Sequence, residues 1–285
     1  MLKHYYLVTK PGIIYGNLVT VLGGFFLATH STHRSVDFGL LLATLLGISL
    51  TIAGSCVMNN IIDRDIDALM ERTKNRELVL GVIRPRDALV YGLILSVLGT
   101  LVLFFFTNPL TLLAALIGVF FYVVCYSLYA KRGGVFGTLV GSVSGAVPPV
   151  VGYLAVTNTV DVGAILLFLI LSIWQMPHSY AIAIYRLEDY RKAKIPVLPV
   201  ARGLMRTKVE TLIYTLLFAC VIFALYAFSY AGNIYIALMG TATLLWLLLS
   251  VQGFFQSNDR QWAKRMFIGS ILIIMLFSFA ISLPF

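Results

Sequence analysis

The sequence predicts an all-α, multi-pass membrane protein with nine transmembrane helices. Of its 285 residues, 60% are hydrophobic and only 12% are charged, whereas a soluble domain has roughly 25% charged residues. Apolar runs long enough to cross the roughly 30 Å hydrocarbon layer of a membrane recur along the whole length. We therefore expect one membrane domain over residues 1–285, whose structural units are the helices themselves.

Nine apolar runs give the expected helices in chain order. They cover residues 13–29, 38–58, 87–107, 109–129, 135–156, 162–184, 210–230, 233–253 and 267–284. The first run has no small-residue cleavage site and leads into the second after a short loop, so we do not expect it to be a cleavable signal peptide. Two long charged loops, after the second and sixth runs, resemble each other, which indicates two related four-helix halves followed by a ninth helix.

Lysine and arginine predict the orientation, because cytoplasmic loops are enriched in these residues. With the amino terminus inside, all but one of the 21 lysines and arginines flank the cytoplasmic ends of the spans, and only Arg34 lies outside. The carboxyl terminus is then outside, and we expect the cytoplasmic (inner) membrane as the location. This placement explains the net charge of +9 without a nucleic-acid partner, for which the sequence has no motif.

The stretch "NNIIDRDIDALMERTKNR" at 59–76 follows the second span and concentrates acidic and basic side chains. On a helix that continues from the span, Asn59, Asp63 and Asp67 drift by only about 80° in total and form one oxygen-bearing stripe. Asp65 projects from a different face. We therefore expect Asp65 to be the dispensable acid.

Two interpretations of this stripe are open. The acids could be solvated at a helix end or paired with Arg64, Arg72 and Lys74. Three oxygen ligands on one face repel one another unless a cation joins them, and Mg²⁺ typically bridges such carboxylates to substrate phosphates. The spacing favours a site for Mg²⁺ and a diphosphate, turned towards the cytoplasm.

Basic residues supply the other half of this hypothesis, although each alone could reflect membrane orientation. Arg72, Lys74 and Arg76 follow the stripe, and Lys131 and Arg132 end the fourth span on the same side. Such cations would hold a diphosphate and stabilise it as a leaving group. Because the sequence has no P-loop and no Gly-rich nucleotide fingerprint, we expect a prenyl diphosphate with its hydrocarbon tail between the helices.

Several separated motifs carry a family resemblance. The pattern "NxxxDxxxD" in the 59–76 stretch, the "ERTKNR" after it and "YSLYAKR" at the end of the fourth span resemble the intramembrane aromatic prenyltransferase (UbiA-type) superfamily. Within it, "VTKPGIIYGNL", "GSVSGAVPPVVGY", "WQMPHSYAIAIYRLEDY" and "IPVLPV" are similar to the protoheme IX farnesyltransferases, also called haem O synthases. The resemblance covers nearly the whole chain.

This resemblance implies a helical bundle around a central cavity, with farnesyl diphosphate as donor and haem b as acceptor. Mg²⁺, held by Asn59, Asp63, Asp67 and Asp189, would bind the diphosphate. The vinyl group of haem would attack the farnesyl cation, and water would then capture the cation next to the porphyrin to give haem O. Haem A synthase or a terminal oxidase would receive the product.

One motif departs from the superfamily pattern. Many members have a second DxxxD after the sixth span, where this chain has Tyr185 and, four residues on, Asp189. A tyrosine cannot replace a carboxylate as an ionised metal ligand near neutral pH, because its phenol has a pKa of about 10. Asp189 is therefore the expected acidic ligand of this loop, and the number of Mg²⁺ ions is open.

Aromatic and histidine side chains are further candidates for the cavity, with packing as the alternative for each. Tyr122, Tyr126 and Tyr129 recur at i, i+4 and i+7, and their rings could stabilise a cation; Tyr185 is a weaker candidate. His178 lies inside the sixth span near its cytoplasmic end, where an ionisable residue is a functional candidate. It could ligate the haem iron, contact a propionate, shuttle a proton or simply bond a helix carbonyl.

Two other functions are open on the sequence alone. One is a prenyltransferase of the superfamily that acts on a quinone precursor or a chlorin, against which the Tyr185 departure and the "WQMPHSYAIAIY" stretch argue. The other is a transporter for a divalent cation or an organic anion. A transporter needs a site open to both faces, whereas the candidate ligands cluster on one side.

Overall fold

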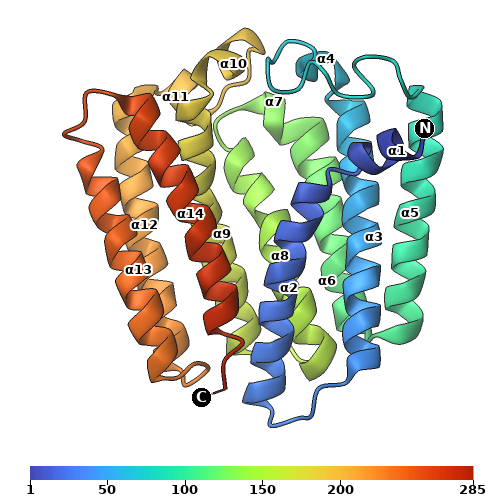
Figure 1. Cartoon of the computed structure of the whole chain (residues 1–285), viewed down its shortest axis with the longest axis vertical. Coiled ribbons are helices and arrows are strands. Elements are labelled where there is room, and N and C mark those ends of the chain that lie inside the picture. Colours follow the sequence, from blue (N-terminus) through green and yellow to red (C-terminus); the bar gives the residue numbers. More distant parts are fainter. Residues whose placement is uncertain (285) are drawn as a thin grey trace.

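The computed structural model describes residues 1–284 and, over that range, consists of helices without strands (Figure 1). Within these residues nine helices are long and apolar enough to cross a membrane. They are α2 (Pro11–Ser31), α3 (Phe38–Ile62), α5 (Pro85–Phe106), the continuous α6, η1 and α7 (Pro109–Gly133), α8 (Gly137–Thr157), α9 (Val162–Tyr185), α12 (Gly203–Ala227), α13 (Asn233–Gln252) and α14 (Asp259–Ala280). The predicted all-α, nine-span membrane fold is confirmed.

The short helices gather at one end of the bundle, which we call the charged end. It carries α1 (Leu2–Val8), α4 (Arg64–Asp67), α7 (Lys131–Gly133), α10 (Leu187–Lys192) and α11 (Leu198–Ala201), whereas the carboxyl terminus lies at the opposite end (Figure 1). The two long charged loops meet at this end, where Ile66 and Met70 of the first pack with Ala193 and Ile195 of the second. Packing thus joins two segments that lie more than a hundred residues apart in the sequence.

Two spans begin earlier than the apolar runs predict. Helix α12 starts at Gly203 and α14 starts at Asp259, because each helix continues past the apolar run into a charged first part. Arg206 and Glu210 form an ion pair one turn apart at 2.8 Å, and Lys208 of α12 pairs with Asp259 of α14 at 2.5 Å. Hydropathy excludes such residues from a span, although the helix accommodates them at its polar end.

Local sequence signals explain where many helices begin. A side-chain oxygen at the N-cap accepts the backbone N–H three residues on, which satisfies a donor that the helix leaves free. These caps are Asp37 of α3, Asn108 of α6, Asp161 of α9 and Asn258 of α14. Proline, which needs no N–H partner, occupies the first position of α2, α5 and α6.

Helix α8 lies at the centre of the bundle and packs against α2, α6, η1 and α9. Glycines permit its close approach to α2. A Cβ atom added to Gly24 would lie 2.0 Å from the carbonyl oxygen of Pro149, and one added to Gly152 would lie 2.1 Å from that of Val21. Small residues at helix interfaces are the usual means of tight packing in membranes, and here they fix the frame around a cavity.

Candidate active site

A cavity of about 720 Å³ lies between the helices and reaches the charged end. Its polar part is lined by Arg72, Lys131 and Tyr190, which come from the two charged loops and α7. Its deeper part is apolar and includes Ile48, Val147, Leu171, Trp174, Phe267 and Ile274. A cavity of this size, with few polar groups at one end, is typical of small-molecule sites, and it offers separate places for a charged head and a hydrocarbon tail.

Asn59 in the last turn of α3 and Asp63 at its C-cap are almost fully buried. They lie behind Lys131, which lines the cavity, and are not themselves among its lining residues. The Asn59 amide donates to Asp63 Oδ2 and to Ser127 Oγ, each at 2.8 Å. The Lys131 ammonium donates to the same Asp63 oxygen at 2.5 Å. Asp63 Oδ1 is buried and has no hydrogen-bond partner among residues 1–284. An unsatisfied buried carboxylate oxygen is costly, so a ligand at this atom would relieve the cost.

Asp67 is also buried, at the end of the short helix α4 that follows Asp63. Arg76 donates to Asp67 Oδ2 at 2.5 Å and to the side-chain oxygen of Asn60 at 3.2 Å. Thr73 Oγ1 donates to the Asp67 carbonyl at 2.9 Å and closes the loop between them. The loop therefore returns on itself and presents Arg76 to the acid stripe.

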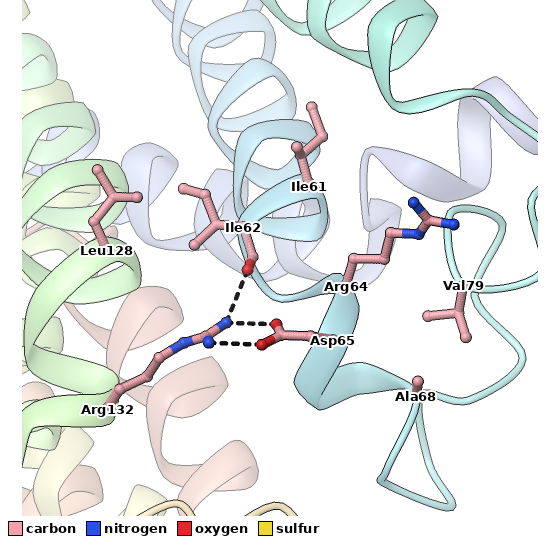
Figure 2. Close-up of a pocket in the computed structure, with 8 residues that line it drawn as sticks. All are labelled: Ile61, Ile62, Arg64, Asp65, Ala68, Val79, Leu128 and Arg132. Atoms are coloured by element: carbon pink, nitrogen blue, oxygen red, sulfur yellow. Dashed lines mark hydrogen bonds and ion pairs between the residues drawn. The ribbon is translucent and has the colours of Figure 1, made fainter.

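Asp65 pairs with Arg132, as Figure 2 shows. Arg132 donates to both of its carboxylate oxygens at 2.7 and 2.6 Å and to the Ile62 carbonyl at 2.9 Å. These groups line a surface pocket beside Arg64 and Leu128 rather than the central cavity. The Arg132 guanidinium lowers the pKa of Asp65. Consecutive residues of a helix diverge by about 100°, so Lys131 faces the cavity while Arg132 is directed to the surface pair.

Other basic residues occupy three different settings. Arg72 lines the cavity, whereas Lys74 pairs with Glu71 at 2.6 Å on the exposed surface. Lys10, at the start of α2, donates to the side-chain oxygen of Asn59, and burial lowers its pKa to about 8. Sequence reasoning assigned Lys10 to membrane orientation only. Lys10 stands directly before Pro11 in "VTKPGIIYGNL", a segment similar to the protoheme IX farnesyltransferases, and this position was the signal that could have marked it as a site residue.

Asp189 of the second charged loop bonds the first loop, but neither Asp189 nor Tyr185 is among the residues that line the cavity. Asp189 is buried in α10, and its Oδ1 accepts the backbone N–H of Glu71 from the first loop at 3.3 Å. Tyr185 ends α9, and its ring packs beneath the guanidinium groups of Arg186 and Arg260, 4.7 and 5.4 Å from the ring centre. Tyr185 lies outside the residues that line the cavity, because these two cations hold its ring elsewhere.

The three tyrosines of the fourth span do not share a face. Tyr122 and Tyr126 line the cavity and stack with ring centres 6.1 Å apart, but Tyr129 is 70% exposed. Residues Phe121–Ala130 form a π-helix, whose longer turns rotate each residue by less than the 100° of an α-helix. The α-helical spacing therefore gave the wrong face for Tyr129. The same turn places Ser127 against Asn59.

The donor set fits Mg²⁺ bound together with a diphosphate rather than alone. Among residues 1–284 no three His, Cys, Asp or Glu side chains cluster as a ready-made metal site. Asp63 and Asp67 each have one oxygen paired with a cation, and Asp63 Oδ1 is unpartnered in the described residues. Mg²⁺ is usually bound through one or two carboxylates plus substrate phosphates, which this arrangement can provide.

Comparison with known proteins places the chain in a family. Residues 17–272 match the UbiA prenyltransferase family over most of the chain's length. The chain belongs to the UbiA prenyltransferase family.

Within the UbiA family, proteins named protoheme IX farnesyltransferase are similar to this chain over its full length. Those of Acinetobacter baylyi and Acinetobacter baumannii are 50% identical over 285 residues, which span 100% of this chain and 97% of each relative. The protein of the same name from Yersinia enterocolitica is also 50% identical and is covered to 95%. The similarity includes both charged loops and all nine spans.

Solved structures of UbiA proteins share the fold. A digeranylgeranylglyceryl phosphate synthase superposes with a TM-score of 0.78 at 19% identity, covering 98% of both chains. A UbiA homologue from Archaeoglobus fulgidus, bound to GPP and Mg²⁺, superposes with a TM-score of 0.66 at 19% identity, covering 98% of this chain and 99% of that one. At this identity the likeness shows the fold alone.

Proposed function

We infer that this UbiA-family enzyme transfers a farnesyl group from farnesyl diphosphate to a vinyl group of haem b, with addition of water, giving haem O and diphosphate. The observation that carries this inference is the 50% identity over the full chain with protoheme IX farnesyltransferases. The cavity agrees with it, because a polar end beside buried acids adjoins an apolar interior.

The diphosphate is bound at the charged end, where Asp63, Asp67, Asn59 and Asp189 would hold Mg²⁺. Bound there, Mg²⁺ neutralises the charge that develops on the diphosphate as the carbon–oxygen bond breaks. Lys131 and Arg76, now paired with the two aspartates, would turn to the phosphate oxygens and make charge-assisted hydrogen bonds.

Residues outside this group play smaller parts in the proposal. Arg72 lines the same cavity and adds to its positive charge. Lys74 and Arg132 are held in surface pairs with other acids, so we leave them out of the diphosphate site. Tyr122 and Tyr126 face the cavity, where their rings would stabilise the farnesyl cation and exclude water from it.

The charged end faces the cytoplasm in this proposal, and the carboxyl terminus lies outside. The support is the asymmetry of the basic residues, of which only Arg34 sits in the α2–α3 connection at the opposite end. In a bacterial cell this orientation corresponds to the inner membrane. Haem A synthase or a terminal oxidase would receive the product. The resemblance of the two long charged loops supports a division into two related four-helix halves followed by α14.

The test is a product assay on membranes that contain the protein. Membranes are incubated with haem b, farnesyl diphosphate and Mg²⁺, and mass spectrometry follows haem O and released pyrophosphate. We expect both products, their loss when the metal is chelated, and recovery when Mg²⁺ is restored. Membranes with the Asp63→Asn variant are the matched control. Prenylation of a quinone precursor or a chlorin, with haem b left unchanged, would reject the assignment.

A further inference from the structure

His178 lies in the cavity but apart from the diphosphate residues. It is seven residues before the end of α9 at Tyr185, which places it roughly 10 Å inside the bundle from the charged end. Its ring stacks on that of Trp174, with ring centres 4.7 Å apart and ring planes at 25° to each other. The ring of Phe267 in α14 packs against it as well, with ring centres 5.2 Å apart. All three side chains line the cavity. The ring is therefore held in one orientation by two aromatic neighbours.

Hydrogen bonds determine which ring nitrogen carries the proton. His178 Nδ1 lies 2.7 Å from Ser270 Oγ, and the Ser270 hydroxyl lies 2.6 Å from the carbonyl oxygen of Phe267. A carbonyl has no proton to give, so the single Ser270 proton goes to Phe267. Both short contacts are satisfied only if Nδ1–H of His178 donates to Ser270 Oγ.

The other ring nitrogen is then left with its lone pair. The apolar surroundings favour the neutral ring, in which one nitrogen donates and the other accepts. Among residues 1–284, His178 makes its hydrogen bond through Nδ1 and none through Nε2, and the side chain lines the cavity. A lone pair that faces a cavity from a ring fixed through its second nitrogen is the arrangement of a metal-ligating histidine.

We propose that His178 Nε2 is an axial ligand of the iron of the haem acceptor, with Ser270 as the positioning residue that fixes its tautomer and orientation. The proposal rests on the proposed function, because it assumes haem b as the substrate. A neutral imidazole nitrogen is an ordinary haem-iron ligand. Coordination needs no proton transfer or electron transfer, since Nε2 donates its lone pair to the iron.

Depth in the bundle favours ligation over a role for His178 as the base of the reaction. The carbon that leaves the diphosphate must lie near Asp63 and Lys131, at the polar end of the cavity. His178 lies about two turns deeper along α9. Vinyl groups sit at the rim of the porphyrin and the iron at its centre, so iron held at His178 would let a vinyl group reach from there towards the polar end. Ligation would therefore position the acceptor without touching the reacting bond.

Spectroscopy of bound haem b tests this directly. The purified full-length protein in detergent is titrated with ferric haem b, without farnesyl diphosphate, and absorption and electron paramagnetic resonance spectra are recorded. We expect the spectrum of an imidazole-ligated haem for the wild type. His178→Ala should lose that spectrum and bind haem at least about tenfold more weakly, and added imidazole should restore the spectrum. His178→Cys should replace it with a thiolate-type spectrum.

Ser270 and a second histidine provide the matched variants. Ser270→Ala should keep haem bound but alter the resonance spectrum and weaken binding by roughly tenfold, whereas Ser270→Thr, which keeps the hydroxyl, should restore both. His30 of α2 is also held by one hydrogen bond, here to the backbone carbonyl of Ser282 at 3.0 Å, but it lies at the opposite end. His30→Ala should leave the spectrum of bound haem unchanged.

The outcomes separate the two inferences. If wild-type membranes form haem O while the His178→Ala protein keeps the wild-type haem spectrum, ligation by His178 is wrong and the proposed function stands. The same holds if the wild-type protein binds haem without any imidazole signature. If the wild type neither binds haem b nor forms haem O, both inferences fail.

Discussion

Asp63 and Asp65 lie two residues apart, and each pairs with a basic residue of the same neighbouring segment. Asp63 pairs with Lys131, and Asp65 pairs with Arg132. The side chains of the first pair are 1% and 16% exposed, whereas those of the second are 64% and 39% exposed. Two ion pairs between the same two segments thus occupy opposite environments.

The difference determines what each pair can do. Arg132 uses both carboxylate oxygens of Asp65, and water screens that pair, so it contributes little beyond a local contact. The buried pair has one Asp63 oxygen without a partner among residues 1–284, and its charges are poorly screened. Burial therefore makes Asp63 and Lys131 responsive to an added ligand, while Asp65 and Arg132 are already satisfied.

The largest expected effect is on turnover. Asp63→Asn removes the charge that would hold the metal and diphosphate, and we expect haem O formation to fall by about 100-fold or more. Asp65→Asn should stay within about twofold of the wild type, because its carboxylate lies at the surface. Initial rates from the mass-spectrometric assay measure both. Equal losses in the two variants would contradict the division into a buried site and a surface pair.

The second prediction concerns stability. Lys131→Met leaves the Asp63 carboxylate buried without its cation, and we expect the protein to lose about 3 kcal/mol of unfolding free energy. Arg132→Met should cost less than about 1 kcal/mol. Unfolding of the purified variants in detergent gives both values, and adding Asp63→Asn to Lys131→Met should recover part of the loss. A larger loss for Arg132→Met than for Lys131→Met would reverse the assignment of the two environments.

A third prediction extends the contrast to the π-helix. Tyr126 lines the cavity and Tyr129 is exposed. Loss of one cation–π contact in a desolvated site is worth about 1–2 kcal/mol, so Tyr126→Ala should lower the rate of haem O formation by roughly tenfold. Tyr129→Ala should change it by less than about twofold. If Tyr129→Ala proved the more damaging change, the helix would have regular α-helical turns in the working enzyme.

The smallest expected effect is the pH dependence of the surface pair. Arg132 lowers the pKa of Asp65, so the pair stabilises the folded protein when Asp65 is ionised. Its contribution, about 0.5 kcal/mol for an exposed pair, is fully present above the ordinary aspartate pKa and is lost as the pH falls through the lowered one. Comparing the unfolding of wild type and Asp65→Asn from neutral to acid pH measures it. If the difference in unfolding free energy between the two proteins grew on acidification, Arg132 would not be stabilising the ionised form of Asp65.

Much of the fold follows from patterns within single segments. Apolar runs give the number of spans, and the helical spacing of Asn59, Asp63 and Asp67 is enough to separate them from Asp65. Hydropathy missed the first turns of α12 and α14, because their charges are paired at the helix ends. Helical periodicity misplaced Tyr129, because it assumes α-helical turns where the chain forms a π-helix.

The sequence by itself determined the nine spans, the crowding of acids and bases at one end, and the family, since these depend on local composition and spacing. Only the tertiary structure decided which charges meet. Asp63 bonds Lys131 across 68 residues, His178 bonds Ser270 across 92, and Glu71 bonds Asp189 across 118. Such contacts, and the hydrogen bond from Lys10 to Asn59, depend on how the helices pack. Packing brings distant residues together, and no pattern within one segment specifies which ones.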